Sequence, residues 1–181
     1  MTPNNFFGFR IYFTILITIA IWLVLIYDYF HGGVPSHHLL QRDDLPAISN
    51  WWGGITIPLL TWFLLYQVQQ KIDKANIDSK LLKNIIYAFF GALCYGILLS
   101  VFFTFGIVNV PFYMLIGLLI LALFFPIYRA ECFLGFVLGM SYTFGGILPI
   151  GIAIIFALLG AGLYMAVRTG VLFIASRFTK K

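Results

Sequence analysis

The stretch NIIYAFFGALCYGILLSVFFTFGIVNVPFYMLIGLLILALFFPIY, residues 84–128, decides the fold, because none of its 45 residues carries a charge. A single helix of that length would extend for about 68 Å, more than twice the roughly 30 Å hydrocarbon core of a bilayer. Asn109 and Pro111 supply a break near its middle. The stretch therefore predicts two membrane-spanning helices that are joined by a tight connection.

The composition of the whole chain agrees with a membrane protein. Hydrophobic residues make up 62% and charged residues 9% of the 181 residues, whereas soluble domains have about 45–50% and about 25%. We predict an all-α, polytopic membrane protein with six transmembrane helices in a single transmembrane domain. The predicted spans are residues 7–30, 51–69, 83–106, 110–127, 129–144 and 148–168, with an outer loop at 31–50. The fifth span is short, so a re-entrant or broken helix is an alternative there.

Positive charges are distributed unequally between the two sides of these spans. The loop at 31–50 contains Arg42 as its only basic residue apart from histidines, and the other side carries nearly all the rest. Under the positive-inside rule, both termini are predicted to be cytoplasmic and the loop at 31–50 to be periplasmic or exterior. The expected location is the cell membrane, in the bacterial case the inner membrane. The basic residues on the cytoplasmic side are Arg10, Lys71, Lys74, Lys80, Lys83, Arg129, Arg177, Lys180 and Lys181.

The net charge of +5 does not indicate a nucleic-acid partner. The basic residues are scattered at helix ends and form no patch interleaved with exposed aromatic residues. The two cysteines, Cys94 and Cys132, lie inside apolar runs without a CxxC spacing, so neither a disulfide framework nor a redox motif is predicted. Recognisable nucleotide-binding and metalloprotease motifs are also missing, which leaves the cofactor unknown.

All three histidines of the chain fall in one loop, at His31, His37 and His38, and Asp43 and Asp44 follow them. Imidazole and carboxylate groups are ligands for zinc and other first-row divalent metals. Candidate catalytic residues in the same loop are His37, His38 and Asp44. The candidate metal ligands are Asp28, His31, His37, His38 and Asp43.

Two local structures are expected in this region. Asp28 and His31 are three residues apart, so they share a face if the first helix continues through both. Ser36 has the character of an N-cap, which favours a short interfacial helix over residues 37–44. A polar, solvated loop without a metal is the alternative.

Small residues on the fifth predicted span allow a close helix–helix approach. Gly135 and Gly139 form a G-x-x-x-G motif, which lets two backbones come near each other. The partner is either another helix of the same chain or a second copy of the chain.

Three functions remain open from the sequence. The first is a metal-dependent membrane enzyme that acts on a lipid or another hydrophobic substrate at the outer face. The second is a transport or ligand-binding subunit with the loop at 31–50 as a lid. In size and topology this interpretation resembles the membrane-embedded substrate-binding subunits of vitamin transporters, an analogy at the level of the fold alone. The third is an accessory subunit of a membrane complex.

Overall fold

The computed structural model describes residues 3–38, 44, 46–74, 79–107 and 109–178, and it is an all-α fold with one small β-hairpin. The prediction of an all-α chain with six helices is confirmed. The helices are α1 (Pro3–Phe30), α2 (Gly53–Lys74), α3 (Ser79–Thr104), α4 (Asn109–Phe124), α5 (Ala130–Phe144) and α6 (Ile147–Phe178). Strands β1 (Ser36–His38) and β2 (Ala47–Ser49) and a 3₁₀ turn, Asn50–Trp52, connect α1 to α2.

Three of these helices are long and apolar enough to cross a membrane. The qualifying segments are Phe6–Phe30 in α1, Lys80–Thr104 in α3 and Ile147–Gly170 in α6. Helices α4 and α5 have 16 and 15 residues, or about 24 and 22 Å of helix, which is less than the hydrocarbon core. Three helices that are long and apolar enough to cross a membrane indicate that the chain is a membrane protein.

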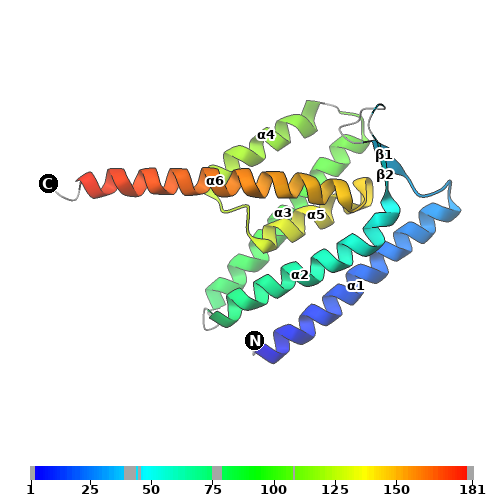
Figure 1. Cartoon of the computed structure of the whole chain (residues 1–181), viewed down its shortest axis with the longest axis horizontal. Helices are drawn as coiled ribbons and strands as arrows, with labels where there is room; N and C mark the ends of the chain where they lie inside the picture. Colours follow the sequence, from blue (N-terminus) through cyan, green and yellow to red (C-terminus); the bar gives the residue numbers. More distant parts are fainter. Residues whose placement is uncertain (1–2, 39–43, 45, 75–78, 108, 179–181) are drawn as a thin grey trace.

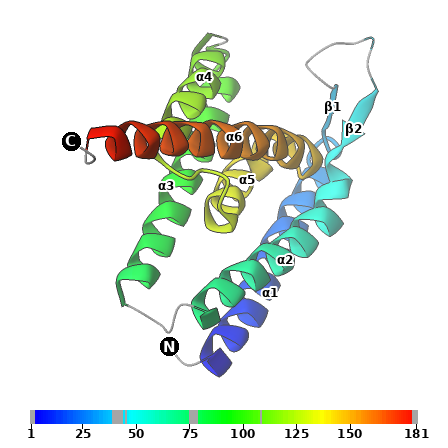
Figure 2. The same ribbon diagram turned by 60° about the vertical axis from the view of Figure 1, so that its left-hand side comes forward.

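Two helix pairs, α1 with α2 and α3 with α5, make the most extensive helix–helix contacts, and α6 packs against α4 and α5. In both views α1 lies beside α2, and α6 runs across α3 and α5 with its C-terminal end extending beyond them (Figures 1 and 2). The β-hairpin sits at the end of α1 and α2 that is remote from the N-terminus. One end of the bundle therefore carries the β-hairpin between α1 and α2, and the other end carries the N-terminus.

Glycines bring α3 and α5 into backbone contact. A Cβ atom added at Gly135 or Gly139 of α5 would overlap the carbonyl oxygens of Phe89 and Leu93 of α3. A Cβ atom at Gly96 of α3 would lie 2.6 Å from a carbonyl oxygen of α5. The G-x-x-x-G motif thus lies against another helix of the same chain, where any side chain would force the two backbones apart.

The prediction of a short interfacial helix over residues 37–44 is wrong. His37 and His38 belong to strand β1, where they pair with Ile48 and Ala47 of the antiparallel strand β2. The pairing supplies hydrogen-bond partners to the backbone without a helix, and Asn50 N donates to Pro35 O over 3.0 Å beside it. Neighbouring residues of a strand point to opposite faces, so the two imidazoles diverge. Residues 39–43 and 45 lie outside the described residues.

Candidate functional site

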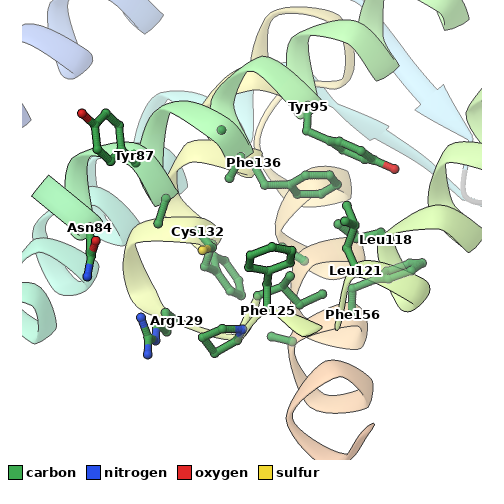
Figure 3. Close-up of a pocket in the computed structure, with 18 residues that line it drawn as sticks. Asn84, Tyr87, Tyr95, Leu118, Leu121, Phe125, Arg129, Cys132, Phe136 and Phe156 are labelled. Carbon is green, nitrogen blue, oxygen red and sulfur yellow. The ribbon is translucent and has the colours of Figure 1, made fainter. Parts of the chain in front are cut away.

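A cavity of about 460 Å³ lies between α3, α4, α5 and α6. Its volume is in the range of about 300–1,000 Å³ that is usual for small-molecule and cofactor sites. Aromatic and aliphatic side chains from all four helices form most of its wall (Figure 3), among them Leu118, Leu121, Phe125, Phe136 and Phe156. The cavity is therefore suited to an apolar group.

Small residues keep the cavity open. Among the residues that line it are Gly91 and Ala92 of α3 and Ala153 and Ala157 of α6. A Cβ atom added at Gly91 would meet no other atom within 4 Å, in contrast to the glycines at the α3–α5 contact. Helix α3, which glycines hold against α5 at one level, thus borders open space at another.

Polar groups lie at the two ends of the cavity. Figure 3 shows Asn84 and Arg129 near each other at one end and Tyr95 at the other. The Tyr95 hydroxyl donates a hydrogen bond to the backbone carbonyl of Met114, which joins α3 to α4. The two ends of the cavity therefore differ: the end at Tyr95 has a neutral hydrogen bond, and the end at Arg129 carries a positive charge.

Arg129 is the one lining residue with a formal charge. Its side chain is exposed, and the described part of the chain provides no hydrogen-bond or ion-pair partner for its guanidinium group. The backbone of Arg129 is extended, with φ −68° and ψ 147°, and α5 begins immediately after it. The cation is consequently held at the rim of the cavity by the start of a helix.

The connection from α4 to α5 is closed by short-range backbone hydrogen bonds. Phe125 N donates to Leu121 O over 2.8 Å, and Ile127 N donates to Phe125 O over 2.8 Å. Pro126, between them, has no N–H to satisfy, and its carbonyl accepts from Arg129 N over 3.2 Å. Tight turns thus supply partners for several of the backbone groups in this connection.

An ion pair engages the carboxylate nearest in sequence to Arg129. Lys71 Nζ of α2 lies 2.6 Å from Glu131 Oε1 in the first turn of α5, and the Glu131 side chain is only 3% exposed. A carboxylate in a first helical turn also interacts favourably with the helix dipole. Because Lys71 neutralises Glu131, the positive charge of Arg129 remains available to pair with another anion.

A second buried charge lies towards the same end of the bundle. Arg10 of α1 is only 6% exposed, and its guanidinium carbon lies 3.9 Å from the centroid of the Trp62 ring of α2. Arg10 Nη1 donates a hydrogen bond of 3.0 Å to Gln69 Oε1. A cation over an aromatic ring is stabilised by the ring quadrupole, so Arg10 holds α1 against α2.

Helix α1 ends at Phe30, so it does not continue through His31, as a shared helix face for Asp28 and His31 requires. His31 stacks on the Tyr27 ring with centroids 4.0 Å apart, and its Nδ1 lies 2.8 Å from Tyr27 O. Gly32 and Gly33 end α1 with φ of 119° and 96°, and Gly33 N donates to Asp28 O over 2.9 Å. The Asp28 side chain instead borders a small recess between α1, α2 and α5 that also includes Asn50 and Tyr142.

The other candidates from the sequence do not converge in the described residues. The His37 ring lies 5.9 Å from the Phe144 ring, and its Nε2 is buried, whereas His38 and Asp44 are exposed. Asp43 lies outside the described residues. Among the residues that are described, no group of three or more His, Cys, Asp or Glu side chains is placed to hold a metal ion. The catalytic and metal roles of these residues stay predictions.

The sequence interpretation missed the cavity. The one available signal in the sequence is the pair of charged residues Arg129 and Glu131 at the start of the short fifth predicted span. Asn84, Gly91 and Tyr95 look like ordinary residues of a membrane helix, and they line the same cavity as Arg129 only through the packing of four helices. Comparison with known proteins finds no matching family model, no matching curated protein and no matching solved structure.

Proposed function

We propose that this chain is a multi-pass membrane protein that binds a hydrophobic or amphiphilic ligand in the cavity between α3, α4, α5 and α6. The observation that carries the proposal is the cavity itself, about 460 Å³ in volume, with aromatic walls and a polar rim at one end. Apolar walls with a few convergent polar groups are the usual composition of a ligand site. This is a ligand-binding function, located away from the loop at 31–50.

The proposal includes six crossings of a bacterial inner membrane, with both termini in the cytoplasm. The distribution of Lys and Arg supports this orientation. Helices α4 and α5 are short, and such spans are accommodated by local thinning of the bilayer or by side chains that reach to the headgroups. Arg129 at the start of α5 is suited to that role, which puts the rim of the cavity at the cytoplasmic headgroup level.

A variant that fills the cavity tests the ligand-binding function. Gly91→Leu adds a side chain where an added Cβ atom meets nothing within 4 Å, so the protein is expected to fold normally. Native mass spectrometry of the purified protein should show an amphiphile retained by the wild type and lost from this variant.

Gly151→Leu is the matched control. Gly151 of α6 also has open space for a Cβ atom, but it does not line the cavity. Retention by the wild type and by Gly151→Leu, together with loss from Gly91→Leu, supports the proposal. Equal retention by all three proteins, or retention by none, contradicts it.

Cysteine labelling tests the orientation in the membrane. In a background with Cys94 and Cys132 replaced by alanine, single cysteines are introduced at Ser36 of β1 and at Lys74, the last residue of α2. A membrane-impermeant maleimide applied to the periplasmic side should label Ser36→Cys but not Lys74→Cys. The reverse pattern, or labelling of both, would overturn the proposed topology.

The metal-dependent enzyme and the accessory subunit remain hypotheses from the sequence. Elemental analysis of the purified protein addresses the first of them directly. A stoichiometric divalent metal that disappears in His37→Ala would favour it over the ligand-binding function proposed above.

A further inference from the structure

We infer that the cavity selects an amphiphile with an anionic head, a carboxylate or a phosphate, which pairs with Arg129 while the apolar chain lies between α3 and α6. This inference rests on the proposed function and specifies the class of ligand. It is carried by the coincidence of an apolar cavity with a single unpaired cation at its rim.

The charge balance of the rim favours an anion. Arg129 is the one charged residue among those that line the cavity. Glu131, which is its nearest acidic neighbour in sequence, is held by Lys71 at 2.6 Å. Lys83 directly precedes Asn84, a lining residue, in the sequence, so the chain adds a further cation and no acid at this point. A ligand with a negative head would therefore complete the charge balance of the rim.

The geometry of the guanidinium group fits the same class of head. Arginine presents a planar fork of donors that matches a carboxylate or a phosphate oxygen pair, and such charge-assisted pairs are roughly twice as strong as neutral hydrogen bonds. The Asn84 amide lies near Arg129 at this end (Figure 3) and offers further donors. At the border of an apolar cavity the attraction is less screened than in water.

The walls are suited to the rest of the molecule. Phe125, Phe136 and Phe156 line the space beyond the rim, and they would remove an apolar chain from contact with bulk lipid. The Tyr95 hydroxyl at the far end already donates to Met114, so that end offers no strong site for a second polar head. A ligand with one polar end fits the cavity better than a ligand with two.

Spin-labelled lipids in nanodiscs of zwitterionic lipid provide the test. The probes are spin-labelled stearic acid, its methyl ester and spin-labelled phosphatidic acid, and electron paramagnetic resonance measures the motionally restricted fraction of each. The acid should bind about tenfold more tightly than the ester, as expected for one charge-assisted hydrogen bond. A comparison of stearic acid with phosphatidic acid separates a free carboxylate from a phospholipid head as the source of the anion.

Arg129→Gln should abolish the preference for the acid over the ester. Arg168→Gln makes the same change on α6, eleven residues beyond the lining residue Ala157 or about 16 Å of helix, and should preserve the preference. Equal binding of acid and ester to the wild type, or an equal loss in both arginine variants, overturns the anionic ligand. If the motionally restricted fraction of every probe is the same in Gly91→Leu as in the wild type, the probes contact only the lipid-facing surface of the protein. The proposed function itself then fails.

Discussion

The two ends of the helix bundle hold their polar residues in opposite ways. At the end with the β-hairpin, the chemically versatile residues of one loop are mostly exposed or bonded to nearby backbone, as His31 is to Tyr27 O. At the other end, Arg10 and Glu131 are 6% and 3% exposed, and each has a partner on α2. Clustering in sequence thus marks the first end, whereas buried charged side chains with partners on another helix mark the second.

In this molecule, neighbours in the sequence separate in space, whereas residues far apart in the sequence meet. Neighbouring residues such as His37 and His38 diverge when they occupy a strand. Lys71 and Glu131 are 60 positions apart and meet because α2 and α5 pack together. A binding site requires such convergence, and the cavity with Arg129 at its rim lies at the end that has it.

The largest effect is expected from removing the partner of the buried carboxylate. Lys71→Met leaves Glu131 without a counter-charge, and breaking a buried pair in this way costs about 3–5 kcal/mol. The free energy of unfolding in mixed SDS and non-ionic detergent micelles measures the loss. Lys74→Met, at an exposed position of the same helix, should leave stability nearly unchanged.

A double variant sharpens this test. Lys71→Met combined with Glu131→Gln removes both charges and should recover most of the stability, because no unpaired buried charge remains. If the single variant loses less than about 1 kcal/mol, the pair behaves as a surface salt bridge and the contrast between the ends is weakened.

An intermediate effect is expected at Arg10. Arg10→Met keeps much of the apolar side chain but loses the interaction with Trp62 and the hydrogen bond to Gln69, for a cost of about 1–2 kcal/mol. The same unfolding assay measures the change, and Arg168→Met provides an exposed arginine for comparison. Equal losses of unfolding free energy in the two variants would show that the buried contacts of Arg10 contribute nothing to stability.

The smallest effect is expected at the hairpin end. His31→Ala and His38→Ala alter exposed side chains, and such substitutions change stability by about 0.5 kcal/mol or less. Ligand retention in native mass spectrometry should also be unchanged. Loss of the ligand from either variant, with the cavity intact, would indicate that the ligand binds at the loop at 31–50 and not in the cavity.

Much of the fold follows from local properties of the sequence. The uncharged run at 84–128 predicted two helices, and α3 and α4 meet at a break beside Asn109 and Pro111. Gly145, with φ of 68°, ends α5 where the sequence has a glycine pair. Helix periods and turn residues act within a few positions of themselves, so they can be recognised without knowledge of the packing.

The site could not be predicted in the same way. Gly91 and Gly139 are both glycines in apolar helices, yet one borders open space and the other touches a backbone. The sequence indicates only that Arg10 is a topology signal near the start of the first span, and its burial depends on Trp62 and Gln69, more than 50 positions away. These properties arise from tertiary packing, which a single sequence does not encode in any local pattern.

The central claim is that the cavity between α3 and α6, and not the histidine loop, holds the ligand. Photocrosslinking with a diazirine-labelled fatty acid tests it directly, with adduct sites mapped by mass spectrometry and with excess unlabelled fatty acid as competitor. Adducts that the competitor suppresses should fall on lining residues such as Tyr95, Leu118 and Phe136. Competed adducts confined to residues 31–52, with none on the lining residues, would contradict the claim.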